Sequence, residues 1–265
     1  MDNKSILQFN LESDLIIKRI FFGLLFIELF LVANDFFCYF ILKLSGTSIS
    51  KVISVSCETS IANWFSSVQF LLIGLIFIFV SLIKHKDEGL KKSFMWILFG
   101  LFFLYFSVDD GAGIHEQISL DLRKYIQSFL ESKKYSGISN LLNRFPSYAW
   151  QLILGPVFLV MGYLIFIFFW NKLKTVKIKL MFLSSILFLI LAEVMDFIEG
   201  LNESFLTFVK QYTDNTTSVI HLIMVFEEFL EMFAITLFFI TCLKILFEEL
   251  NNCNFKIINS VNYKK

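Results

Sequence analysis

The hydrophobic positions of this chain fall into six long runs separated by shorter polar segments. Each run is rich in Leu, Ile, Phe and Val and approaches or exceeds the roughly 20 helical residues that cross a hydrocarbon core of about 30 Å. The apolar residues are consecutive rather than alternating, which indicates helices and excludes the strands of a β-barrel. The predicted spans are residues 16–40, 63–83, 93–110, 148–171, 179–200 and 219–247.

This pattern predicts an all-α fold, a polytopic transmembrane helical bundle in one integral-membrane domain, residues 1–265. The composition agrees, because 57% of the residues are hydrophobic and 35 are phenylalanine, too many for the surface of a soluble domain of this size. The lipid bilayer is therefore the expected partner. Lys plus Arg and Asp plus Glu both number 23, so net charge gives no reason to expect a nucleic-acid partner.

Basic residues gather on one side of the six-span arrangement, and this asymmetry predicts its orientation. The positive-inside rule places that side, with both termini, in the cytoplasm, and the expected location is the bacterial inner membrane. The basic residues on that side are Lys4, Lys18 and Arg19 before the first span, Lys84, Lys86, Lys91 and Lys92 in the second link, Lys172, Lys174, Lys177 and Lys179 in the fourth, and Lys244, Lys256, Lys264 and Lys265 after the last span.

The longest link, between the third and fourth spans, contains a second helical signal. Leu122, Tyr125, Ile126, Phe129 and Leu130 recur at helical spacing among charged residues. This pattern predicts an amphipathic helix that either lies in the outer membrane interface or caps the bundle.

Ionisable residues inside the spans are the main functional signal, because they are costly in lipid and usually face a bundle interior or a cavity. From the helical rise, Glu193 lies about 10 Å, and Glu228 roughly 12 to 15 Å, below the outer side. No Lys or Arg interrupts these acidic stretches. The acids and histidines are Asp109, Asp110, His115 and Glu116 around the end of the third span, Glu193, Asp196 and Glu199 in the fifth, and His221, Glu227, Glu228 and Glu231 in the sixth.

Carboxylates combined with one or two imidazoles on bundle helices are the ligands of di-iron and di-manganese centres. The sequence therefore predicts a site for a divalent metal ion, iron, manganese or zinc, near the outer face. The familiar Glu-x-x-His pairs of such centres are absent. The predicted metal ligands are Asp109, His115, Glu116, Glu193, Asp196, His221, Glu228 and Glu231, and the predicted supporting residues are Asp35, Asp110, Glu199 and Glu227.

Several features leave two interpretations open. Asp109 and Glu116 share a face only if the third helix continues through Gly111 and Gly113, and these glycines either open the helix towards a cation or end it. Glu28 is expected to be a hydrogen-bonded acid that stabilises helix contacts or, in a transporter, a candidate with Glu193 for a deeper step of transport.

Cys38 and Cys57 both fall on the outer side. They could form a disulfide in an oxidising compartment or remain buried thiols.

Two short motifs in this chain are similar to motifs found in other proteins. The strings Asp109-Asp110-x4-His115-Glu116 and Glu227-Glu228-x2-Glu231-Met232 resemble motifs of uncharacterised prokaryotic multipass membrane proteins, over the third to sixth spans. The resemblance implies a multi-pass membrane fold and carries no activity over to this chain.

Three functions are compatible with these residues. The first is a membrane-embedded metalloenzyme that acts on a lipid or other membrane-soluble substrate. The second is a transporter of divalent cations or protons, which needs a polar route to the cytoplasmic side. The third is a non-catalytic assembly or sensor protein whose acids hold the helices together. Substrate, reaction and oligomeric state are not encoded in any motif that the sequence displays.

Overall fold

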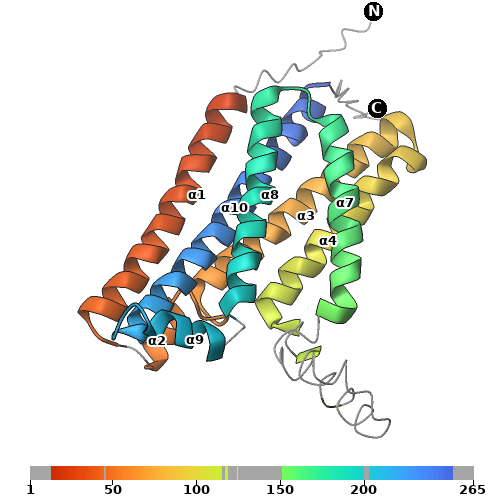
Figure 1. Ribbon diagram of the computed structural model, residues 1–265. Helices are drawn as coiled ribbons and strands as arrows, with labels where there is room; N and C mark the ends of the chain where they lie inside the picture. The colour runs from red at the N-terminus through yellow and green to blue at the C-terminus, as the bar shows by residue number, and fades with distance from the viewer. Residues whose placement is uncertain are drawn as a thin grey trace, which may run out of the picture.

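The computed structural model describes residues 13–44, 46–114, 117–118, 124, 151–199 and 203–252. All six predicted runs are helical over most of their length, and no strand occurs in these ranges. The long helices are α1 (Ser13–Phe36), α3 (Ile61–Glu88), α4 (Leu90–Ala112), α7 (Gln151–Lys172), α8 (Val176–Glu199) and α10 (Thr216–Asn252) (Figure 1). A π-helical turn (Phe37–Ile41) extends α1, and α2 (Ser48–Ile53) and α9 (Glu203–Lys210) are short.

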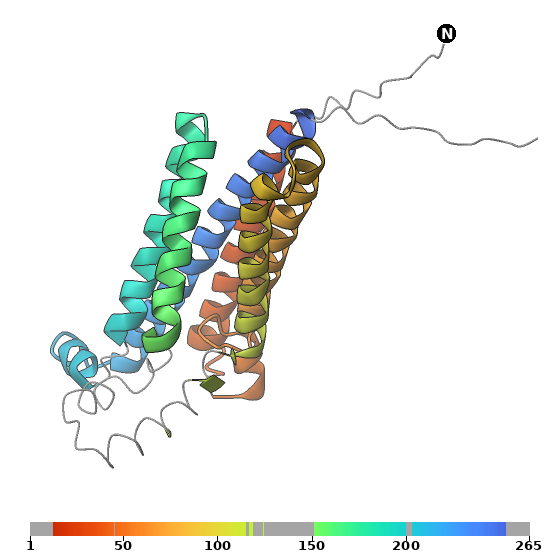
Figure 2. The same ribbon diagram turned by 90° about the vertical axis from the view of Figure 1, so that its right-hand side faces the viewer.

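The helices run roughly alongside one another, and α10 is the central one. It packs against α1, α3, α8 and α9. Helix α1 begins at the end of the bundle where α10 ends, whereas α2 and α9 lie at the opposite end (Figures 1 and 2). That opposite end is called the α2/α9 end below, and it is the end that the charge pattern predicts to face outwards.

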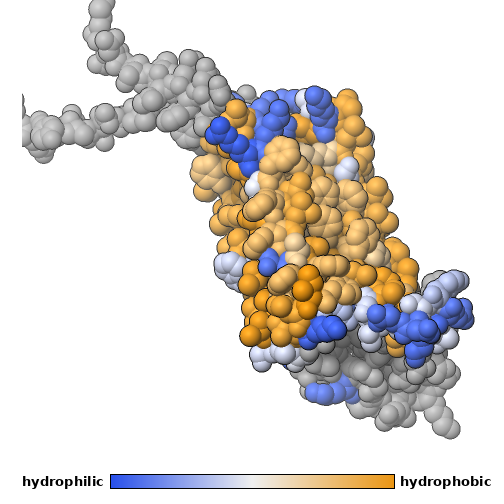
Figure 3. Space-filling model, turned by 90° about the vertical axis from the view of Figure 1, so that its left-hand side faces the viewer, coloured by the Kyte–Doolittle hydropathy of each residue, from blue (hydrophilic) through white to orange (hydrophobic). Residues whose placement is uncertain are grey.

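Within the part of the chain that the structure describes, five helices are long and apolar enough to cross a membrane, namely α3, α4, α7, α8 and α10. On the face of the bundle that Figure 3 shows, a broad apolar band lies between more polar ends. Exposed leucines and phenylalanines on this scale are costly in water and ordinary against lipid tails. These helices are those of a multi-pass membrane protein.

Two apolar clusters fill the interior. The larger, called the aromatic cluster, contains Phe77, Phe99, Phe169 and Phe182, all fully buried, and joins α3, α4, α7, α8 and α10. The smaller, called the outer cluster, consists of Leu31, Val55, Ala62 and Met232, with Val32 and Phe65 packed against it. The aromatic cluster fills the bundle towards the end where α10 finishes, and the outer cluster lies towards the α2/α9 end.

Helices α3 and α4 approach each other through two glycines. A Cβ atom added at Gly74 would lie 2.9 Å from Leu104 Cδ2 and 3.0 Å from the carbonyl oxygen of Gly100. One added at Gly100 would lie 2.8 Å from Ile78 Cγ1. Small residues allow this close backbone contact between membrane helices, so the pair of glycines sets the α3–α4 crossing.

The links between the spans match the sequence predictions only in part. The amphipathic helix predicted over residues 122–130 lies outside the described residues, except that Lys124 is helical. Helix α2 was not predicted, and α9 lies in the link between the fifth and sixth spans. The placement of both termini in the cytoplasm stays a prediction.

Replacing Gly74 by alanine should destabilise the bundle although alanine is the better helix former. The added methyl group meets Leu104 and the Gly100 backbone, and overpacking typically costs about 1 to 3 kcal/mol, which exceeds the roughly 1 kcal/mol gained in helix propensity. The melting temperature of the detergent-purified protein should fall. Gly162→Ala on α7 is the matched control, because its Cβ would meet nothing within 4 Å. Equal melting temperatures for the two variants would contradict the proposed contact.

Candidate functional site

Carboxylates from three helices converge towards the α2/α9 end. Glu228 on α10 is half-buried and lies within electrostatic range of Asp110 on α4 and Asp196 on α8. It also interacts with Glu227 and Glu231 of its own helix. Residues about 120 positions apart in the sequence are therefore brought within electrostatic range of one another.

Helix α8 contributes the rest of this acidic cluster. Glu227 lies within electrostatic range of Glu193, Asp196 and Glu199. Of these, Glu193 is exposed, whereas Asp196 and Glu199 are half-buried. The acidic cluster, as the name is used below, consists of Asp110, Glu193, Asp196, Glu199, Glu227, Glu228 and Glu231.

Hydrogen bonds to α3 hold the end of α4 where its acids meet the cluster. Asn63 Nδ2 donates to the carbonyl oxygen of Asp110 at 2.9 Å. One turn further along, Ser67 Oγ donates to the carbonyl oxygen of Ser107 at 2.7 Å. These bonds fix the rotation and depth of the α4 end, because each ties a side chain of one helix to the backbone of the other.

The two glycines at this end have different roles. Helix α4 runs through Gly111, where a Cβ would lie only 3.0 Å from Ser67 Oγ, and it ends at Ala112. Gly113 adopts a left-handed conformation with φ of 59° and donates to the carbonyl oxygen of Asp109, which is a common helix ending. The glycines therefore do not open α4. The continuation of this helix to Glu116 that the sequence argument required is not seen within the described residues, because α4 ends at Ala112 and Glu116 lies outside them.

A metal ion requires several ligand side chains within coordination distance of one point. The residues that the structure describes contain no group of three or more His, Cys, Asp or Glu side chains arranged to hold a metal. His115 and Glu116 lie outside the described residues. The carboxylates are thus within electrostatic range of one another rather than at coordination distance, and the ligand assignments stay predictions.

A second feature of this end is a buried pair formed by Asp35 and His221. Asp35 Oδ1 lies 2.6 Å from His221 Nε2. Asp35 Oδ2 accepts hydrogen bonds from Ser54 Oγ at 2.9 Å and from the Val55 amide at 2.7 Å. Three donors therefore surround a carboxylate that is only 2% exposed, which is how a buried charge is stabilised. Because a carboxylate only accepts hydrogen bonds, His221 Nε2–H is the donor to Asp35 in this contact.

The π-helical turn after α1 positions an aromatic ring over this imidazole. Its defining hydrogen bond runs from the Leu42 amide to the Phe37 carbonyl oxygen, at 3.1 Å. The ring of Tyr39 stacks on that of His221 with 3.7 Å between centroids and 13° between planes. Such π turns within helices are frequently found at functional sites. Here the turn fixes the orientation of the imidazole from a second side.

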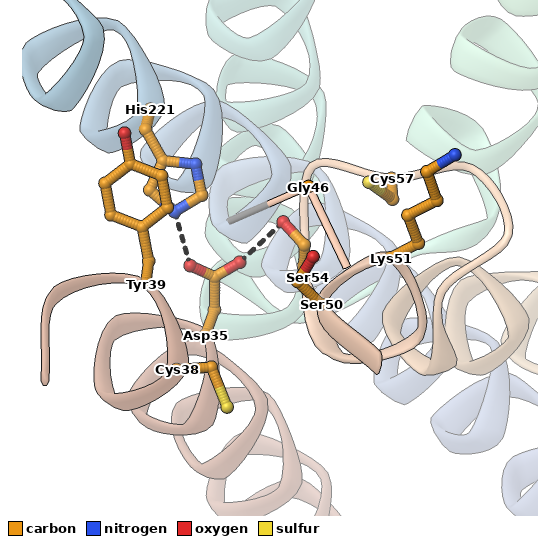
Figure 4. A pocket seen from close by; sticks show the side chains of 9 residues that line it. All are labelled: Asp35, Cys38, Tyr39, Gly46, Ser50, Lys51, Ser54, Cys57 and His221. Atoms are coloured by element: carbon orange, nitrogen blue, oxygen red, sulfur yellow. Dashed lines mark hydrogen bonds and ion pairs between the residues drawn. The ribbon is translucent and has the colours of Figure 1, made fainter. Parts of the chain in front are cut away.

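The pair lines a pocket of about 240 Å³. In Figure 4 the second ring nitrogen of His221 points away from Asp35, towards the side where Gly46 and Cys57 lie. Cys38 and Cys57 both line this pocket as free thiols, so the disulfide considered from the sequence is not formed. The nine lining residues are Asp35, Cys38, Tyr39, Gly46, Ser50, Lys51, Ser54, Cys57 and His221.

Sequence reasoning found some of these groups and missed others. It selected Asp35 and His221 separately, without pairing them, and it overlooked Tyr39 and Ser54. The position of Tyr39 one turn after Asp35 was an available signal. The expectation that Glu28 is a hydrogen-bonded acid is confirmed, because the Thr236 hydroxyl donates to it.

Replacing Asp35 by asparagine should destabilise the folded protein. The amide lacks the charge that three donors stabilise, and hydrogen bonds to charged groups contribute about 1.5 to 3 kcal/mol each at most. The melting temperature in detergent should fall by several degrees, by the usual scaling of stability to melting temperature. Asp14→Asn makes the same change on the same helix at a side chain that is 86% exposed, and it should melt like the wild type. A stable Asp35→Asn protein would show that the pair contributes nothing to folding.

Comparison with protein families adds one match. A family model described as a domain of unknown function (DUF8692) matches residues 24–246, a range that includes every residue of the acidic cluster and of the Asp35–His221 pair. No curated protein and no solved structure matches the chain. Because the family model spans most of its length, the chain belongs to the DUF8692 family.

Proposed function

We propose that this is a six-span membrane protein whose α2/α9 end faces outwards and carries a divalent-metal site that serves chemistry on a lipid-like substrate. The observation that carries the proposal is the convergence of carboxylates from α4, α8 and α10 around Glu228. Carboxylate oxygens are the preferred ligands of hard and intermediate divalent ions, and iron, manganese and zinc all accept them.

Helix α1 is included as the first span because its apolar side chains face outwards and its acidic side chains face the interior of the bundle. Phe22 and Phe26 are 64% and 69% exposed, whereas Glu28 and Asp35 are buried. A helix with aromatic residues outside and acids inside suits a lipid environment and is unfavourable in water. With α1 included there are six spans, and an even number of crossings returns the chain to its starting side. This agrees with α1 beginning at the end of the bundle where α10 finishes.

The acidic cluster supplies the proposed ligands. Glu228, Asp196 and Glu231 were selected from the sequence as ligands, and Glu227 as a supporting residue. Binding of a cation would draw oxygens that are now within electrostatic range to coordination distance, and it would offset their mutual repulsion. A bound divalent ion supplies Lewis-acid or redox chemistry to a water or oxygen molecule.

The Asp35–His221 pair supplies proton transfer. Asp35 holds the imidazole in one tautomer, so His221 Nδ1 can accept a proton on the side of the pocket. The pocket is lined mainly by apolar atoms and lies at the α2/α9 end, which suits the polar end of a membrane-soluble substrate. Lys51 at its edge would favour an anionic head group.

The packing of the opposite half of the bundle favours a one-sided site over transport. A carrier of cations or protons needs polar groups along the whole path. Beyond the level of Glu28 and Thr236, the described core towards the end of α10 is filled mainly by the aromatic cluster, in which Phe77, Phe169 and Phe182 are fully buried.

Metal analysis of the detergent-purified protein tests the proposal. The wild type should contain stoichiometric iron, manganese or zinc after dialysis, and Glu228→Gln should reduce the metal content at least tenfold, because it removes an anionic ligand at the centre of the cluster. Glu248→Gln is the matched control, since Glu248 is exposed near the other end of the same helix.

Asp196→Asn provides a second test of the ligand set from α8 and should also lose metal. The site would be refuted if the folded wild type contained no more metal than the background after dialysis. Equal metal contents in the Glu228→Gln and Glu248→Gln proteins would refute it as well. Such a result would leave the helical bundle unaffected and would favour an assembly or sensor role.

A further inference from the structure

Three polar side chains from three helices meet in the middle of the bundle, outside the site described above. Thr236 on α10 accepts a hydrogen bond from Gln69 Nε2 on α3 at 2.6 Å. Its hydroxyl donates in turn to Glu28 Oε1 on α1. Glu28 and Thr236 are 0% exposed and Gln69 is 1% exposed. The three residues therefore form a continuous hydrogen-bonded chain, called the Glu28 chain below.

The Glu28 chain lies at the boundary between the two apolar clusters. On α1, Leu24 packs against the aromatic cluster and Leu31 belongs to the outer cluster, with Glu28 between them. On α3, Gln69 lies between Phe65 of the outer cluster and Ile73 of the aromatic cluster. The arrangement repeats on α10, where Thr236 lies between Met232 and Ile240. The chain thus forms one polar layer enclosed by hydrocarbon on both sides.

Within this layer the described groups supply fewer donors than acceptors. The second carboxyl oxygen of Glu28 and the amide oxygen of Gln69 are buried without a hydrogen-bond partner among the described residues. Both side chains contact the same hydroxyl oxygen, so their polar heads lie within roughly 5 Å of each other. A buried acceptor without a donor costs about 1 to 3 kcal/mol, and more when it is charged. One added proton on Glu28 would turn an unpaired acceptor into a donor.

We propose that Glu28 is a proton-binding site, with Thr236 and Gln69 as its fixed partners. A metal ion fits this place less well, because the Thr236 oxygen is already engaged with both neighbours and too few oxygens are left for the six or more ligands of a hard cation. A proton needs no further ligand. Proton binding at Glu28 couples to helix packing, since the chain joins α1, α3 and α10 at a single point.

Other titratable groups on these helices lie well away from Glu28. Towards the α2/α9 end the next are Asp35 on α1, seven residues on, and Glu231 on α10, five residues before Thr236, at about 10 Å and 8 Å along the helix axes. In the other direction they are Cys242 and then Lys244 on α10, Arg19 on α1 and Lys84 on α3. The interactions that act on Glu28 are its burial and its bond to Thr236, so its proton is controlled within the layer.

Reaction with dicyclohexylcarbodiimide tests the proposal on the full chain in detergent. A protonated carboxyl group in an apolar site adds to the carbodiimide carbon through its oxygen while its proton moves to a nitrogen, and the adduct rearranges to a stable acylurea that mass spectrometry locates. Glu28 should be modified, and its modification should decline as the pH is raised. Glu248, which is exposed, serves as the internal control and should remain below one tenth of the Glu28 yield at every pH.

Two variants separate proton binding from a purely structural role. Glu28→Gln imitates the protonated side chain, so it should fold, melt at least as high as the wild type and lose the dependence of melting temperature on pH that Glu28 confers. Thr236→Val removes the donor that favours the charged form, so Glu28 modification should persist to a pH higher by about one unit or more.

Absence of modification at Glu28 over the whole pH range, in protein that remains folded, would overturn the proposal. The same conclusion would follow if Thr236→Val left the pH profile of modification unchanged. Neither readout depends on metal content, so this proposal and the metal site can fail separately.

Discussion

The position of α10 relative to α1 and α3 is the constraint on which the rest of the structure depends. Lipid tails offer no hydrogen bonds, so each polar group that α10 carries through the bundle must find its partner on a neighbouring helix. Thr236 satisfies this requirement in two directions, towards Glu28 and Gln69. A rotation or a one-turn slide of α10 would leave all three groups buried and unpaired, which is costly enough to select one register.

This register also fixes what lies at each depth along α10. Fifteen residues before Thr236, His221 reaches Asp35, and the acids of α10 lie between the two levels, where they face α8 and α4. Beyond Thr236 the same helix presents Phe238, which packs against Phe77 and Phe103. The buried carboxylates of the described core therefore lie at the level of Thr236 or closer to the α2/α9 end, whereas aromatic rings fill most of the other half.

The sequence predicted the helices well and their contacts less well. Long apolar runs identify membrane helices by length alone, and the helical rise is constant, so depth and the convergence of Glu228 with Asp196 could be inferred. Which side chains form a hydrogen bond depends on the rotation of each helix about its own axis. Asp35 and His221 are 186 positions apart, and their meeting also requires the π turn that carries Tyr39. No periodicity in the sequence encodes that turn.

Glu28 and Asp35 show how two acids on one face of one helix take opposite roles. They are seven residues apart, so they point in nearly the same direction. Asp35 receives hydrogen bonds from an imidazole, a hydroxyl and a backbone amide, and these donors hold it as an anion that orients His221. Glu28 receives one hydrogen bond, and its second oxygen meets no donor among the described residues. The same chemical group therefore acts as a fixed charge at the α2/α9 end and as the proposed proton-binding site one layer deeper, because the donors around it differ.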